Sequence, residues 1–169
     1  QGTIFTITLP VTHNYAVNDE KQDEAEIREK AVDEVSDTTD THKTSLLIVE
    51  DNDDFRNFLI NCLKGTYQVF DAPNGKEALE IFKESKLGEI DIILMDVMMP
   101  VMDGLEAARY IRWSNKENAR DIPIIAMTAN AFTEDRRRVL EAGMNEHLAK
   151  PLESEVLIKT IANYCGKVD

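Results

Sequence analysis

From Thr44 onward, short apolar runs alternate with longer stretches in which apolar residues recur at helical spacing. The short runs are rich in Leu, Ile and Val and are bounded by polar residues, a pattern typical of buried strands. The sequence predicts strands over residues 46–49, 67–72, 91–96, 122–129 and 146–150.

The longer stretches predict helices over residues 54–63, 74–85, 104–113, 133–143 and 154–166. Five strand–helix units in succession, with strands that are mostly apolar, indicate a parallel sheet covered by helices on both faces. Because crossover connections between parallel strands are right-handed, the expected fold is a doubly wound α/β sandwich.

The first part of the chain has a different pattern. Residues 1–17 contain no charged side chain, and "GTIFTITLP" alternates with period two, which predicts one β-strand. Residues 18–43 hold ten acids and four bases with few apolar residues, which is typical of a linker. We therefore divide the chain into a terminal strand and tail (1–17), an acidic linker (18–43) and one α/β domain (44–169).

Charge and cysteine content narrow the function. The net charge of −13 argues against direct binding to a nucleic-acid backbone and is compatible with a metal cation or a basic partner. No apolar run reaches the roughly 20 residues of a membrane helix, so we expect no membrane contact. Cys62 and Cys165 have no metal-ligand spacing, and both are predicted to be buried, reduced cysteines of a cytoplasmic protein.

Polar residues that could carry chemistry gather at the carboxyl ends of four predicted strands. Glu50 and Asp51 follow the first strand, and Asp96, Thr128 and Lys150 end the third, fourth and fifth. The carboxyl ends of parallel strands meet at one edge of the sheet, where ligands bind in this class of fold. A buried carboxylate such as Asp96 is costly without a partner, so we expect these groups to form one site.

The residue types at this edge suit an ion and a phosphoryl group. Three neighbouring carboxylates need a cation among them, and Mg²⁺ prefers such oxygen ligands. Lys150 and Thr128 are suited to holding a tetrahedral oxyanion near Asp96. Taken singly, the two acids also fit a helix N-terminus, Thr128 a strand-end cap and Lys150 a solvated base.

Four segments, "LLIVEDND", "ILMDVMMPVMDG", "IIAMTA" and "EHLAKP", resemble the signature segments of response-regulator receiver domains. They occur in the family's order and cover Ser45 to about Gly166. The resemblance implies a flavodoxin-like receiver fold, with a five-stranded parallel sheet in the order 2-1-3-4-5 and five helices.

The resemblance also implies a role for each residue of the site. Asp96 matches the phosphoacceptor, Asp51 the direct ligand of Mg²⁺ (or Mn²⁺), and Glu50 a ligand through water. The carbonyl of Met98 would complete the metal ligands. Phosphoryl oxygens would be held by the Thr128 hydroxyl, the Ala129 amide and Lys150. Pro151 matches the family proline, where the preceding peptide bond is typically cis. His147 occupies the position at which the family often has a switching aromatic residue, so the implied switch of Thr128 and His147 departs from the family's pattern.

The segment "GTIFTITLP" resembles the last strand of the ATP-binding domain of sensor histidine kinases. This strand, a spacer and a receiver follow one another in hybrid histidine kinases. We therefore expect a C-terminal, cytoplasmic fragment of a membrane-bound hybrid kinase that does not itself bind ATP. The implied partners are a phosphohistidine domain as donor and a histidine-phosphotransfer protein as a candidate acceptor.

The residues leave two other functions open, and also one form of self-association. An aspartyl phosphohydrolase would need a second acid two residues after the nucleophile, where this chain has Met98. A non-phosphorylated interaction module would typically have lost the acceptor or the acidic pair. A weak homodimer would pair Arg136–Arg138 of one copy with Glu146, Glu153 or Glu155 of another.

Overall fold

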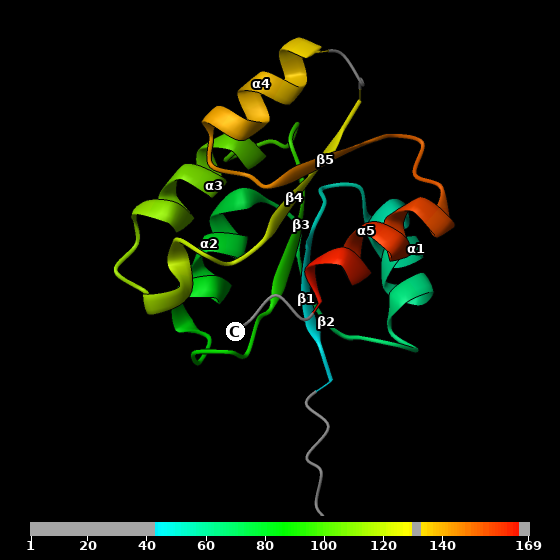
Figure 1. The fold of residues 1–169 in the computed structure, drawn as a ribbon, viewed down its shortest axis with the longest axis horizontal. Helices are drawn as coiled ribbons and strands as arrows, with labels where there is room; N and C mark the ends of the chain where they lie inside the picture. Colours follow the sequence, from blue (N-terminus) through cyan, green and yellow to red (C-terminus); the bar gives the residue numbers. More distant parts are fainter. Residues whose placement is uncertain (1–42, 130–132, 166–169) are drawn as a thin grey trace, which may run out of the picture. The chain divides into compact units, whose positions relative to one another are not determined.

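The computed structural model describes residues 43–129 and 133–165. The predicted strand over 1–17 and most of the predicted linker lie outside these ranges. Within them, strands and helices alternate along the chain (Figure 1). The strands are β1 (Ser45–Val49), β2 (Gln68–Ala72), β3 (Ile92–Asp96), β4 (Ile124–Thr128) and β5 (Glu146–Ala149). The helices are α1 (Asp53–Leu63), α2 (Gly75–Glu84), α3 (Gly104–Trp113), η1 (Glu117–Ala119, a 3₁₀ turn), α4 (Thr133–Glu141) and α5 (Ser154–Tyr164).

All strand pairs are parallel, and the strand order is β2-β1-β3-β4-β5. The predicted α/β fold, its order and its five helices are confirmed. The 3₁₀ turn η1 was not predicted, because three residues are too short to produce a periodic apolar pattern.

Two apolar cores cover the two faces of the sheet (Figure 1). Successive side chains of a strand point to opposite faces, so Leu47 and Val49 of β1 pack toward α2 and α3, whereas Leu46 and Ile48 pack toward α1 and α5. The three central strands are buried along their whole length. Their rigid ends therefore give fixed positions to the residues that follow them.

The prediction of buried cysteines is wrong for Cys62, which is exposed, and holds only in part for Cys165, which is half-buried. The buried stripe of α1 contains only Leu59 and Leu63. Helical spacing identified the correct side of the helix but overestimated the width of its buried stripe, so Phe58 and Cys62 face solvent.

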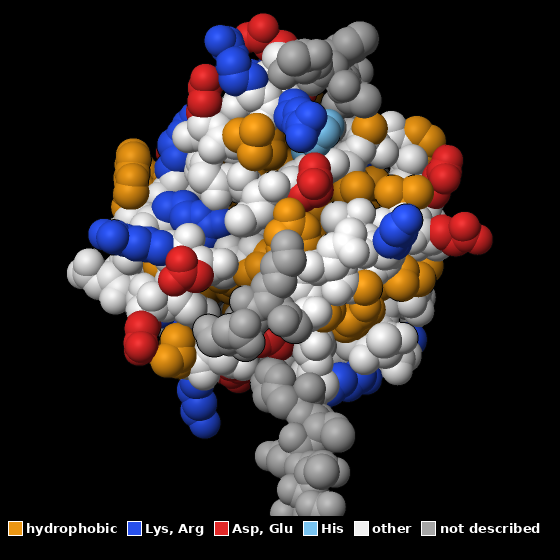
Figure 2. All heavy atoms as spheres, in the orientation of Figure 1, with side chains coloured by type: hydrophobic (Ala, Val, Ile, Leu, Met, Phe, Trp, Pro, Cys, Tyr) orange, Lys and Arg blue, Asp and Glu red, His pale blue; other side chains and the backbone are white. Residues whose placement is uncertain are grey.

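Among the described residues, no helix is both long enough and apolar enough to cross a membrane. On the face shown in Figure 2, hydrophobic side chains form separate patches between charged ones.

Candidate functional site

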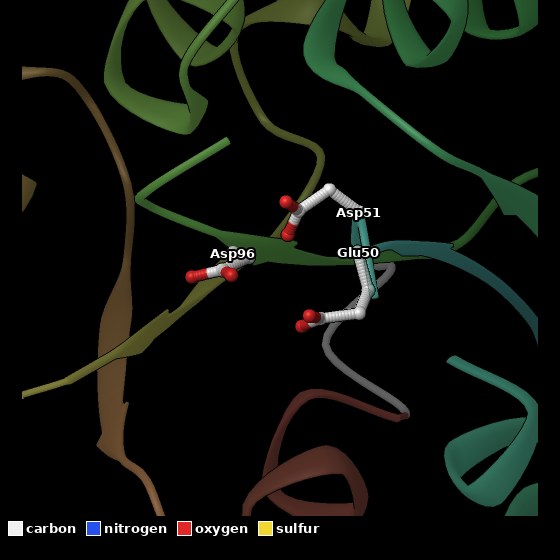
Figure 3. Close-up of side chains that lie close together, drawn as sticks. All are labelled: Glu50, Asp51 and Asp96. Carbon is white, nitrogen blue, oxygen red and sulfur yellow. The ribbon is translucent and has the colours of Figure 1, made fainter. Parts of the chain in front are cut away.

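The predicted site residues stand together at the carboxyl-terminal edge of the sheet. Glu50 and Asp51 follow β1, Asp96 ends β3, and Lys150 follows β5. Figure 3 shows the carboxylates of Glu50, Asp51 and Asp96 turned toward a common space. One oxygen from each of these three side chains lies within 4.8 Å of the other two.

The three carboxylates differ in their exposure to solvent. Glu50 and Asp96 are 1% and 5% exposed, whereas Asp51 is exposed. Burial raises the pKa of Glu50, an effect that the hydrogen bond from Lys150 opposes and the nearby charge of Asp96 reinforces. Two buried acids and one open acid suit a small divalent cation that keeps some of its water.

Lys150 joins the two buried carboxylates. Its Nζ atom lies 2.8 Å from Oε2 of Glu50 and 2.8 Å from Oδ2 of Asp96. Burial lowers the pKa of Lys150, but the hydrogen bonds to Asp96 and Glu50 outweigh that effect, and its pKa is raised overall. The ammonium group is therefore held charged beside the predicted phosphoacceptor.

The backbone around Asp96 is fixed by short-range contacts. The amide of Met98 donates a hydrogen bond to Oδ1 of Asp96 at 3.2 Å. Gly104, the first residue of α3, packs directly against the Asp96 carbonyl: a Cβ atom there would lie 2.1 Å from that oxygen. Only glycine allows the helix to begin this close to the acceptor.

Sequence reasoning missed three residues that support the site. Arg56 donates to the carbonyl of Glu50 at 2.8 Å, and the ring of Phe55 lies 4.9 Å from Nζ of Lys150. Gly104 is the third. The sequence offers one signal for Arg56, a cation in the first turn of a helix that follows paired acids. It offers one for Gly104, a glycine directly after the helix-capping Asp103. Neither signal is specific.

A pocket of about 490 Å³ adjoins the site between α4 and the loop after β3. Its lining includes Met98, Thr128 and Ala129, and Thr128 is 3% exposed. These three residues therefore line one cavity, and their roles toward Asp96 stay a prediction.

The last two predicted site residues, His147 and Pro151, lie on β5 and shortly after it. The peptide bond between Lys150 and Pro151 is cis. His147 is half-buried on β5, an edge strand of the sheet, and its Nδ1 lies 3.5 Å from Oε1 of the adjacent Glu146. It does not belong to the carboxylate cluster, and its part in switching stays a prediction.

Comparison with known proteins identifies the family. Residues 46–162 match the response regulator receiver domain. Hybrid signal transduction histidine kinase I of Dictyostelium discoideum is 37% identical over 119 residues, which are 69% of this chain but only 7% of that kinase. The chain thus spans a small part of the curated hybrid kinases that it resembles.

Two solved structures share the fold. The receiver domain of sensor histidine kinase PA1611 from Pseudomonas aeruginosa, crystallised with a magnesium ion in its active-site cleft, has a TM-score of 0.64 and 38% identity. The match covers 72% of this chain and 96% of that domain. The Saccharomyces cerevisiae Ssk1 receiver, crystallised with the histidine phosphotransfer protein Ypd1, has a TM-score of 0.66 and 35% identity, with 72% and 88% covered.

The parallel order of the sheet, the acidic cluster at its carboxyl edge and the match over residues 46–162 agree with one another. The chain belongs to the response regulator receiver domain family, the receivers of two-component phosphorelays.

Proposed function

We propose that Asp96 is the phosphoacceptor of this receiver. The observation that carries the proposal is the position of Lys150, whose ammonium group bridges Asp96 and Glu50 at 2.8 Å each. Asp96 is buried, and the residues that follow it, Val97 and Met98, line a pocket together with Thr128. A carboxylate held by a fixed cation next to such a pocket is suited to act as a nucleophile.

The donor set fits a hard divalent cation, Mg²⁺ or Mn²⁺. Glu50, Asp51 and Asp96 would hold it, with the carbonyl of Met98 as a further ligand, and their oxygen spacing within 4.8 Å supports this assignment. When bound, the ion would neutralise charge on the phosphoryl oxygens.

The chain's own residues then have separate roles in transfer. An Asp96 oxygen attacks phosphorus, the bond from phosphorus to the donor imidazole breaks, and the imidazole leaves with the bonding electrons and takes up a proton. Lys150 stays paired with the negative charge of the new acyl phosphate. Thr128 and the amide of Ala129 bind its outer oxygens, which draws the end of β4 toward Asp96 and transmits the change to α4.

The relatives suggest the wider context. We propose that the chain is part of a membrane-bound hybrid histidine kinase and acts on the cytoplasmic side of the membrane. In this proposal, residues 1–17 end the kinase domain and residues 18–43 form a linker. Its donor would be a phosphohistidine of such a kinase. The Ssk1 receiver in complex with Ypd1 supports a histidine-phosphotransfer protein as another partner.

A homodimer that pairs α4 of one copy with β5 and the start of α5 of another is a weaker proposal. Arg137 pairs with Glu134 and Glu141, and Arg138 with Asp135, all within α4, so two of the three arginines already have partners. Sedimentation of the phosphorylated protein as a monomer would remove this proposal.

One experiment tests the proposed function. The protein is incubated with Mg²⁺ and acetyl phosphate and then weighed intact. A single phosphate adduct that is absent from Asp96→Asn supports the assignment, with Asp91→Asn as a matched control on the same strand segment. An adduct that persists in Asp96→Asn would place the acceptor elsewhere, and rapid multiple turnover of phosphomonoesters would favour a hydrolase.

A further inference from the structure

Arg112, in the last turn of α3, makes a set of contacts that the proposed transfer chemistry does not use. Its guanidinium donates to the carbonyl of Gly143 at 2.8 Å, the carbonyl of Ala119 at 2.9 Å and Oδ1 of Asn145 at 2.9 Å. All three acceptors are neutral. Burial lowers the pKa of Arg112, partly offset by the charge of Asp121, yet arginine stays protonated. A half-buried cation thus joins the segment that follows α4, at Gly143 and Asn145, to α3 and to Ala119 of η1.

The backbone at this point is shaped to accept that contact. Gly143 has a φ of 85°, which disfavours residues with a Cβ atom, and a Cβ there would lie 3.0 Å from Cγ of Arg112. Asn145 exchanges two hydrogen bonds with the backbone of Ile124: its backbone amide donates to the Ile124 carbonyl, and its side-chain Oδ1 accepts from the Ile124 amide, both at 2.8 Å. The carboxyl end of α4 is therefore tied to α3 and to the start of β4.

The rest of α4 is held much less firmly. Among residues 134–141, whose side chains the structure describes, Val139 alone is buried, and Leu140 is 50% exposed. One side of α4 borders the pocket of about 490 Å³ through Asp135, Arg138 and Val139, and Thr128 lines the same pocket. After the helix, Ala142 and Met144 are buried again. The helix thus has a fixed carboxyl end and open space beside its body.

We propose that Arg112 is a positioning residue that fixes the carboxyl end of α4, so that phosphorylation of Asp96 turns the helix about this end instead of displacing it as a whole. The inference rests on the proposed function, because it needs the end of β4 to respond to the phosphoryl group. Thr128 and Ala129 precede α4, so their movement acts on its amino end, whereas Arg112 restrains Gly143 and Asn145 at the opposite end.

The test is hydrogen exchange of the whole chain, with and without Mg²⁺ and beryllofluoride as a phosphoryl analogue. Wild type is compared with Arg112→Gln, with Arg112→Lys in case the first variant folds poorly, and with the control Arg109→Gln, an exposed arginine on the same helix. In wild type and the control, the analogue should change exchange in the first half of α4 and leave the amides of Gly143, Met144 and Asn145 unchanged. In the Arg112 variants these three amides should exchange about tenfold faster, since a hydrogen bond from a charged donor is lost, and should now respond to the analogue.

The change induced by the analogue separates positioning from simple stabilisation. If exchange in the Arg112 variants rises but its response to the analogue stays as in wild type, Arg112 only stabilises the fold and the proposal is wrong. It is also wrong if Gly143–Asn145 respond in wild type as strongly as the first half of α4. Failure of wild type to form the acetyl-phosphate adduct would instead overturn the proposed function and this inference with it.

Discussion

At the residue scale, the site depends on a cation that the protein itself supplies. Lys150 compensates two carboxylates, Glu50 and Asp96, that are almost completely buried. Burying a charge without a partner is costly, and the ammonium group lowers that cost.

We expect Lys150→Ala to slow phosphorylation by acetyl phosphate about 10²-fold or more, because a positioned donor to developing negative charge is removed. Mg²⁺ affinity should be kept or increased, since the site becomes more negative. Intact-mass time courses and Mg²⁺ titration measure the two quantities. Lys159→Ala, on the exposed side of α5, is the control, and an unchanged rate in Lys150→Ala would contradict the assigned role.

Gly104 is expected to be the glycine most sensitive to substitution near the acceptor. In Gly104→Ala the new Cβ would meet the Asp96 carbonyl at 2.1 Å, and backbone on both sides must shift. We expect the free energy of unfolding to fall by about 1–3 kcal/mol or more, as in other overpacked sites, with slower phosphorylation. Gly65→Ala is the control because no atom lies within 4 Å of its added Cβ, and equal urea midpoints for the two variants would contradict the prediction.

At the element scale, side chains from one segment fasten the ends of another. Arg112 does so for the end of α4, and Lys116 does so for α2. The Nζ atom of Lys116 donates to the carbonyls of Phe82 and Ser85 at 2.5 Å and lies 4.7 Å from the Phe82 ring. Since the last carbonyls of a helix lack partners within it, a half-buried cation there stabilises the helix end.

Lys116→Met should lower the free energy of unfolding by about 1.5–3 kcal/mol, because charge-assisted hydrogen bonds to two carbonyls at the end of α2 are lost. The acceptor site is distant from this contact, so phosphorylation of the folded variant should be unchanged. Urea denaturation gives the stability, with Lys83→Met on the exposed side of α2 as the control. A loss no larger than that of the control would show that the contact contributes little.

At the scale of the whole molecule, ion binding is coupled to folding. Glu50, Asp51 and Asp96 come from two strands and converge only in the folded sheet, so the unfolded chain has no equivalent site. A ligand that binds only the folded state stabilises it by mass action, by about 2.7 kcal/mol at 100 times its dissociation constant.

Mg²⁺ should therefore raise the melting temperature of the protein by several degrees relative to EDTA, in proportion to that free energy. Asp51→Ala should lose most of this increase, whereas Asp54→Ala, another exposed acid at the start of α1, should keep it. Differential scanning fluorimetry over a range of Mg²⁺ concentrations measures the effect. Equal increases in both variants would indicate nonspecific screening in place of a site.

Particular residues show how far sequence reasoning reached. The apolar runs at 46–49 and 91–96 predicted β1 and β3 to within a residue, because a strand buried on both faces needs continuous apolar side chains. The acids after those runs were correctly expected at one edge. Cys62 was misplaced, since helical periodicity does not give the width of the buried face. The contacts of Arg56 and Arg112 left no specific pattern in the sequence.

The order of the strands was implied by the resemblance to receiver domains. The sequence by itself determined the number and direction of the strands, and with them the edge at which Glu50, Asp96 and Lys150 gather. These follow from periodic burial and right-handed crossovers, which are properties of local segments. Only the tertiary structure decided that Lys150 bridges Glu50, 100 residues away, and Asp96, and that Arg112 holds Gly143. Such contacts depend on side-chain direction across loops and on packing between distant segments, and no local pattern encodes either.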